Sequence, residues 1–120
     1  MGIRIAIHGA TGRLGQLIAA EAGTAFVGSV ERTGDIPECD VVIDVSSTEG
    51  LGNLLPRLSG QPLLVGTTGT LPIEALEAYS ENAPVALVSN FSAGVPLLLD
   101  LIQKAVASMP DDWSVEVLEA

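Results

Sequence analysis

Short runs of aliphatic residues alternate with longer segments of mixed character along almost the whole chain. A short apolar run bounded by turn residues is typical of a buried strand, and the longer segments between the runs are typical of helices. Because aromatic residues make up only 3% of the chain, the core is expected to be aliphatic, which suits a parallel sheet covered on both faces. This alternation predicts an α/β fold with a doubly wound parallel sheet. The expected strands are residues 3–7, 25–30, 40–45, 62–68, 84–89 and 114–120, and the expected helices are residues 13–23, 47–58, 71–83 and 94–109.

Several residues mark or weaken the ends of these helices. Gly23 is expected to end the first helix, because glycine accepts the left-handed conformation common after a last turn. Pro72 is expected in the first turn of the third helix, where its missing N–H has no partner to lose. Gly50, Gly52 and Pro56 weaken the helix expected over residues 47–58.

Ligands of such sheets bind outside the carboxyl ends of the strands, where the strand order reverses. The residues that directly follow the strands are therefore the candidate contacts. They are residues 9–14, 31–32, 46–47, 66–68 and 89–92.

The segment HGATGRLG places Gly9, Gly12 and Gly15 between the first expected strand and the first expected helix. Glycine permits the tight turn and lets a pyrophosphate approach backbone N–H groups at a helix N-terminus. A third glycine lets the helix lie close to the strand. This context predicts a Rossmann-type dinucleotide-binding domain, and the alternative is a tight turn without a ligand.

An acid and a base end the second expected strand. Glu31 lies 22 positions after Gly9. This is near the spacing of about 20 residues that is typical of the acid that binds the adenosine ribose in dinucleotide-binding domains. Arg32 beside it supplies the cation that a 2′-phosphate requires. The alternative is an exposed Glu-Arg pair without a role.

The segments GTTG (66–69) and SNFSAGV (89–95) follow the fourth and fifth strands. Their glycines, hydroxyls and amide could receive the nicotinamide end of a cofactor. They could equally cap helices through Thr70 or Ser92.

The remaining reactive residue types point to no second site. His8, the only histidine, is expected to be packed or solvated at a strand end. Cys39 is expected to be a packing residue, because the neighbouring Asp40 raises the pKa of its thiol. No cluster of cysteine and histidine exists in the sequence to hold a metal.

The overall charge restricts partners and location. Fifteen acids against five bases give a net charge of −10, which repels phosphate backbones and argues against nucleic acid. A single cysteine fits a cytoplasmic protein, and no apolar stretch is long enough to predict a membrane span.

Taken together, these motifs resemble the dihydrodipicolinate reductase family of bacterial lysine biosynthesis. The matching segments occur in the family's order and cover essentially the whole chain. They are IRIAIHGATGRLGQ, VERTG, DVVIDVSSTEG, LLVGTTG, SNFSAGVPLLL and WSVEVLEA.

The resemblance implies hydride transfer from NADPH or NADH to 4-hydroxy-tetrahydrodipicolinate, giving tetrahydrodipicolinate. It implies no metal, and it places no catalytic residue in these 120 residues. The implied cofactor contacts are Gly9, Ala10, Thr11, Gly12, Arg13 and Leu14 at the pyrophosphate, Glu31 at the ribose, Arg32 at the 2′-phosphate, and Gly66, Thr67, Thr68, Val88, Ser89, Asn90 and Phe91 at the nicotinamide.

The resemblance also implies a domain division. Residues 1–91 would form the dinucleotide-binding domain. Residues 92–120 would form the hinge, helix and first strand of an α+β domain that binds substrate and assembles family tetramers. In the family a catalytic histidine and lysine follow the strand that ends here at Ala120. The 120-residue chain alone is therefore expected to bind the cofactor and to be inactive.

Two alternatives remain at this point. One is a dinucleotide-binding module without catalysis. The other is a short-chain dehydrogenase or epimerase, which needs a Tyr-x-x-x-Lys pair. The only tyrosine, Tyr79, is followed four residues later by Ala83.

Overall fold

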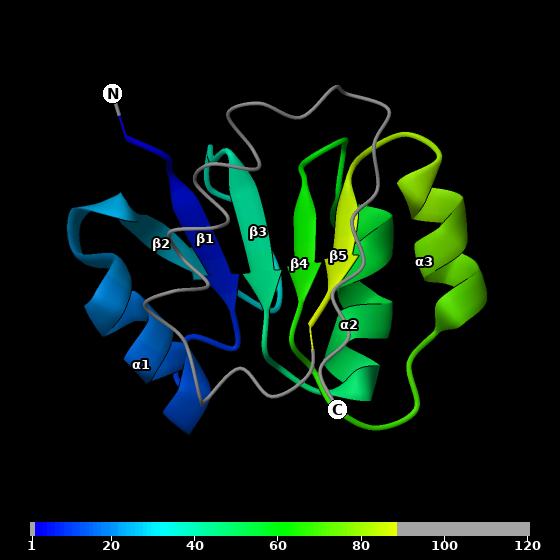
Figure 1. Cartoon of the computed structure of the whole chain (residues 1–120), viewed down its shortest axis with the longest axis horizontal. Coiled ribbons are helices and arrows are strands. Elements are labelled where there is room, and N and C mark those ends of the chain that lie inside the picture. The colour runs from blue at the N-terminus through cyan, green and yellow to red at the C-terminus, as the bar shows by residue number, and fades with distance from the viewer. Residues whose placement is uncertain (1, 89–120) are drawn as a thin grey trace.

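Parallel strands form one five-stranded sheet in the order β2-β1-β3-β4-β5 in the computed structural model, which describes residues 2–88 (Figure 1). The expected doubly wound parallel sheet is therefore confirmed. The strands are β1 (Ile5–His8), β2 (Phe26–Val30), β3 (Val41–Asp44), β4 (Leu63–Val65) and β5 (Val85–Leu87). The α-helices are α1 (Arg13–Ala22), α2 (Thr48–Leu54) and α3 (Ile73–Ser80), and two 3₁₀ turns are η1 (Gly23–Ala25) and η2 (Leu55–Arg57).

The register brings the carboxyl ends of the strands to one edge of the sheet. His8, the last residue of β1, pairs with Val30 of β2 on one side and with Asp44 of β3 on the other. Asp44 in turn pairs with Val65 of β4. The chain runs from β1 outward to β2 and then returns to β3 on the other side of β1, so the strand order reverses between β1 and β3.

Alternate residues of each strand supply the two cores. Ile5 and Ile7 of β1 pack in a cluster with Ile18 of α1. Ala6, between them, points to the opposite face and packs in the cluster that holds Leu51 of α2. Because side chains alternate across a strand, α1 covers one face while α2 and α3 cover the other. Figure 1 shows α1 beside β1 and β2, and α2 and α3 towards β4 and β5.

Glycines define both ends of α1. Gly12 is the N-cap residue in an extended conformation, and Gly23 caps the other end at φ 57°, as expected from the sequence. Within the helix, a Cβ on Gly15 would lie 2.0 Å from the carbonyl oxygen of Gly9 and 2.8 Å from the Cα of Ala10. The absence of a side chain at Gly15 therefore lets α1 lie directly against the turn that follows β1.

The helix expected over residues 47–58 divides into α2 and η2. Ser47 caps α2, accepting a hydrogen bond from the backbone N–H of Gly50 at 3.0 Å. Pro56 has no N–H to continue the α-helical pattern, and it lies at the start of η2. The sequence prediction missed this change of helix type.

Most strand and helix ends differ from the prediction by one to three residues, and two of these differences concern the site or a helix start. β4 ends at Val65 rather than residue 68, because the side chain of Thr67 turns back to hydrogen-bond Asp44. Pro72 is the N-cap of α3 rather than a first-turn residue, while Glu74 lies in the first turn. A carboxylate there is favourably placed against the helix dipole.

The helix expected over residues 94–109 and the strand expected over residues 114–120 lie outside the described residues. Within residues 2–88, no helix is both long enough and apolar enough to cross a membrane.

Candidate functional site

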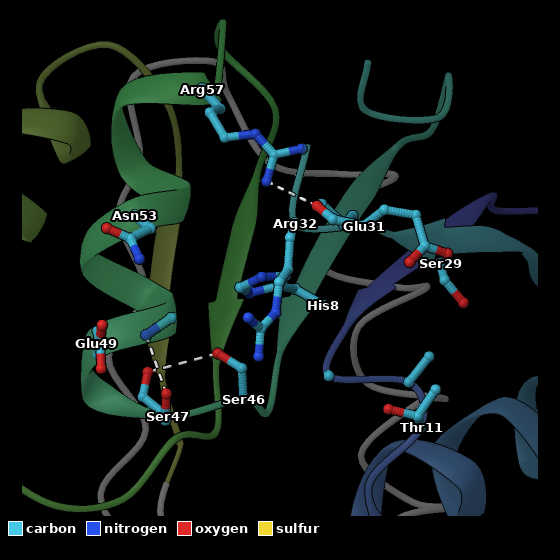
Figure 2. A pocket seen from close by; sticks show the side chains of 14 residues that line it. His8, Thr11, Ser29, Glu31, Arg32, Ser46, Ser47, Glu49, Asn53 and Arg57 are labelled. Carbon is cyan, nitrogen blue, oxygen red and sulfur yellow. Dashed lines mark hydrogen bonds between the residues drawn. The ribbon is translucent and has the colours of Figure 1, made fainter. Parts of the chain in front are cut away.

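A cleft of about 540 Å³ opens at the carboxyl edge of the sheet, where the strand order reverses (Figure 2). It lies between the turn after β1, the end of β2, and one side of α2. This is the position at which doubly wound sheets bind ligands. The lining residues are His8, Gly9, Ala10, Thr11, Ser29, Val30, Glu31, Arg32, Ser46, Ser47, Glu49, Gly50, Asn53 and Arg57.

The turn after β1 requires glycine where it approaches β3. Gly9 has φ 93°, and a Cβ there would lie 2.7 Å from the carbonyl oxygen of Val45. The N–H of Gly12 donates to the carbonyl of Gly9 at 3.2 Å and closes the turn. A Cβ on Gly12, by contrast, would make only one ordinary contact, at 3.5 Å. The first glycine is thus needed by the fold, whereas the second leaves open space.

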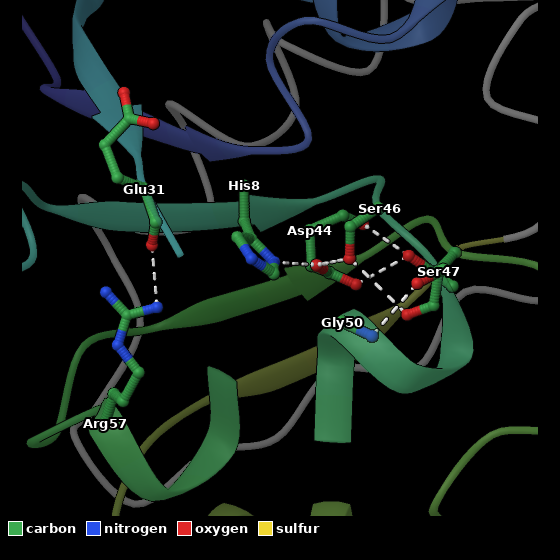
Figure 3. Close-up of polar contacts among 8 residues, drawn as sticks. His8, Glu31, Asp44, Ser46, Ser47, Gly50 and Arg57 are labelled. Carbon is green, nitrogen blue, oxygen red and sulfur yellow. Dashed lines mark hydrogen bonds and ion pairs between the residues drawn. The ribbon is translucent and has the colours of Figure 1, made fainter. Parts of the chain in front are cut away.

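The end of β2 brings an acid and a base to the cleft. Glu31 and Arg32 are both exposed. In Figure 2 the Arg32 side chain extends into the cleft beside His8, whereas the Glu31 carboxylate points towards Ser29. Arg57 lies across from them at the end of η2 and donates to the backbone carbonyl of Glu31 at 2.8 Å (Figure 3).

A buried carboxylate joins three strand ends beneath the cleft (Figure 3). Asp44 is completely buried, and its Oδ1 accepts from Nδ1 of His8 at 2.6 Å and from the Ser46 hydroxyl at 2.7 Å. Its Oδ2 accepts from the Thr67 hydroxyl at 2.6 Å. Because a carboxylate only accepts, His8 is held with its proton on Nδ1. Asp44 therefore ties the turn after β1 to the segments after β3 and β4.

The start of α2 packs closely against the segment after β3. A Cβ on Gly50 would lie 2.6 Å from the Ser46 hydroxyl, so glycine here makes room for the serine that bonds Asp44. Gly50, one of the residues that weakened the helix prediction, thus has a packing role at the edge of the cleft.

Outside the cleft, four titratable groups have shifted pKa values. The side-chain hydrogen bond with Asp40 raises the pKa of Arg4. A hydrogen bond from Arg4 lowers the pKa of Asp40. Burial raises the pKa of the Cys39 thiol, and the Asp40 carboxylate raises it further. The predicted rise of this pKa is confirmed, but burial is a larger cause than Asp40. Burial also raises the pKa of Tyr79, whose hydroxyl donates to the carbonyl of Gln61 at 2.6 Å. That contact lies before β4, at the edge of the sheet opposite the cleft, so Tyr79 is not placed as a dehydrogenase tyrosine.

Comparison of the sequence with known proteins identifies a family. The sequence model described as "Dihydrodipicolinate reductase, N-terminus" matches residues 3–91. The chain belongs to the dihydrodipicolinate reductase family. Its relatives include the 4-hydroxy-tetrahydrodipicolinate reductase of Gluconobacter oxydans, which is 39% identical over 132 residues that cover 97% of this chain and 53% of the relative. The enzyme of the same name from Xanthomonas euvesicatoria is 33% identical over 144 residues, covering 98% of this chain and 60% of the relative.

A third reductase, from Alkalilimnicola ehrlichii, is 30% identical over 155 residues, covering the whole chain and 58% of the relative. The chain thus spans between half and two thirds of the length of these relatives.

In this reductase-family chain, the structure brings part of the predicted cofactor set together. Gly9, Ala10, Thr11, Glu31 and Arg32 all line the cleft. The other predicted residues within the described part lie outside its lining: Gly12, Arg13 and Leu14 at the start of α1, Gly66, Thr67 and Thr68 after β4, and Val88 after β5. Ser89, Asn90 and Phe91 lie outside the described residues.

Sequence reasoning missed several lining residues. Glu49, Asn53 and Arg57 lie on the side of α2 and η2 that faces the cleft. Their spacing of four in a segment expected to be helical places them on one face, and this signal could have identified them. Asp44 was also missed as the partner of His8, and no local pattern indicates a contact made 36 residues apart. Among residues 2–88, no group of three or more potential ligands is placed to hold a metal ion.

Proposed function

We propose that the cleft binds the adenosine and pyrophosphate part of NADPH or NADH. The observation that carries this proposal is that the Gly9 turn, which leads directly into the N-terminus of α1, and the exposed Arg32 line one cleft. Backbone N–H groups at a helix N-terminus favour a pyrophosphate, and an arginine favours an additional phosphate.

The residues at the cleft fit such a cofactor. A Cβ at Gly9 or Gly15 would meet backbone atoms at 2.7 Å and 2.0 Å, so the turn stays thin and close to the helix. We assign Gly9, Ala10 and Thr11, with the neighbouring Gly12, Arg13 and Leu14, to the pyrophosphate. Glu31 is assigned to the ribose, where a carboxylate accepts hydrogen bonds from hydroxyl groups. This assignment needs the Glu31 side chain to turn from Ser29 towards the cleft.

The nicotinamide end is assigned to the next strand ends along the sheet. These residues are Gly66, Thr67 and Thr68 after β4, and Val88, Ser89, Asn90 and Phe91 at and beyond the end of β5. Thr67 donates its hydroxyl to Asp44, so its side chain would position this segment while its backbone faces the cofactor.

For the whole protein we propose the reaction named for its relatives, the reduction of 4-hydroxy-tetrahydrodipicolinate. The cofactor, when bound, supplies the hydride. Residues 2–88 would bind and orient it, and we assign no general acid among them. The division into residues 1–91 for cofactor and 92–120 for the start of a substrate domain is part of this proposal. A homotetramer and a cytoplasmic location complete it.

The test is a calorimetric titration of the 120-residue chain with NADPH and NADH. We expect binding of at least one cofactor, and its loss in Gly12→Val. A valine Cβ at Gly12 makes only an ordinary contact with the fold, so the variant should fold while its side chain obstructs the turn. Unchanged affinity in a folded Gly12→Val variant would remove the glycine turn from the site. Oxidation of NADPH by a full-length protein, supplied with the named substrate, tests the reaction itself.

A further inference from the structure

Arg57 makes a two-pronged contact with the segment that leaves β2. Its Nη1 donates to the backbone carbonyl of Glu31 at 2.8 Å, and its Nη2 donates to the backbone carbonyl of Gly34 at 3.0 Å. These two carbonyls bracket Arg32 and Thr33. The guanidinium therefore spans the turn that carries Arg32 into the cleft.

Among residues 2–88, this contact supplies the hydrogen bonding of that turn. No helix separates β2 from β3, and Gly34 adopts φ 95°. Within residues 2–88, the only hydrogen bond that reaches residues 32–37 is the one from Arg57 to Gly34. Without it, the turn would be held only by its packing and by its two ends.

The contact also distinguishes Arg57 from Arg4. Arg4 pairs with Glu38 and Asp40, whereas no carboxylate among residues 2–88 lies within ion-pair distance of Arg57. Arg57 is half-buried in the wall of the cleft. Its rigid fork, whose donors match two acceptors at once, suits a role in fixing backbone geometry, and lysine cannot reproduce it.

We propose that Arg57 is a positioning residue for cofactor preference: it holds the Glu31–Gly34 turn so that Arg32 is presented to a 2′-phosphate. This inference rests on the proposed dinucleotide cleft. Ordering a turn before the ligand arrives removes an entropic cost from binding. Because Arg32 contacts only the 2′-phosphate in this arrangement, a less ordered Glu31–Gly34 turn should weaken the binding of NADPH more than the binding of NADH.

The experiment compares the dissociation constants of NADPH and NADH for the 120-residue chain and three variants. Arg57→Gln removes the fork, Arg57→Lys leaves a single donor group, and Arg4→Gln removes one positive charge outside the cleft as a matched control. We expect Arg57→Gln to raise the dissociation constant of NADPH about tenfold more than that of NADH. Arg57→Lys should give a smaller effect of the same kind, and Arg4→Gln should leave the ratio of the two dissociation constants unchanged.

A double-mutant cycle with Arg32→Ala separates positioning from a direct charge effect. If Arg57 acts through Arg32, then Arg57→Gln should have little further effect on the NADPH preference once Arg32 is alanine. Additive effects, or equal losses for both cofactors, would overturn the proposal. Circular dichroism confirms that each variant is folded, and Arg57→Lys carries the test if Arg57→Gln does not fold. If the unmodified chain binds neither cofactor, the proposed cleft fails instead.

Discussion

Two helical glycines in this chain should respond to alanine with opposite signs. Gly15 lies in α1 and Gly52 in α2. A Cβ at Gly52 would have nothing within 4 Å, so alanine there should raise the free energy of unfolding by about 0.5–1 kcal/mol through helix propensity alone. A Cβ at Gly15 would lie 2.0 Å from the carbonyl oxygen of Gly9, and the nearest atoms are all backbone.

The expected cost at Gly15 follows from that distance. An ordinary contact begins near 3.4 Å, so α1 would have to move away from the turn by about 1.4 Å. Overpacking of this kind costs about 1–3 kcal/mol, and we take the upper end because backbone cannot rotate aside. After the propensity gain of about 1 kcal/mol, Gly15→Ala should lower the free energy of unfolding by about 2 kcal/mol.

Urea denaturation followed by circular dichroism measures both variants against the unmodified chain. The free energies of unfolding of the two variants should differ by about 2.5–3 kcal/mol. Gly15→Ala should also weaken the binding of NADPH, because the Gly9 turn is displaced. If Gly15→Ala were as stable as Gly52→Ala, the close approach of α1 to the turn would be wrong.

Three further outcomes are expected. Asp44→Asn should lower the free energy of unfolding, measured by urea denaturation, by about 2 kcal/mol. The NH₂ group of the asparagine replaces one carboxylate oxygen that accepts a buried hydrogen bond. Unchanged stability would contradict this hydrogen-bond network. Arg4 lowers the pKa of Asp40 in the fold, so the pair stabilises the protein above about pH 4 and this contribution disappears as the pH falls further. Because the pair is exposed, Asp40→Asn should remove only about 0.5 kcal/mol at neutral pH and flatten the stability profile at acid pH; an unchanged profile would argue against the pair. Arg32→Ala should weaken the binding of NADPH roughly tenfold more than the binding of NADH in calorimetric titrations. Equal losses of affinity for the two cofactors would mean that Arg32 does not bind the 2′-phosphate.

Local pattern was sufficient to predict the sheet and the glycine turn. The strand β1 and the helix α1 each follow from a local signal: a buried aliphatic run, and a helical segment between Gly12 and Gly23. The position of the cleft followed from a general rule about parallel sheets, so Glu31 and Arg32 were expected at its edge.

Contacts between distant segments were not predictable in the same way. Arg57 reaches Gly34 across 23 residues, and His8 reaches Asp44 across 36 residues. Such pairs depend on the strand order and register, which bring the ends of β1 and β3 together only in the folded sheet. The early end of β4 has the same origin, since Thr67 leaves the strand to bond Asp44.

The central claim is that a dinucleotide binds between the turn after β1 and the end of β2. Amide NMR spectra of the 120-residue chain, recorded during a titration with NADPH, test it most directly. We expect saturable shifts of the backbone amides of Gly9, Ala10, Thr11, Glu31 and Arg32, with the exposed side of α3 unaffected. Saturable shifts confined to other surfaces, or no shifts at all, would contradict the account.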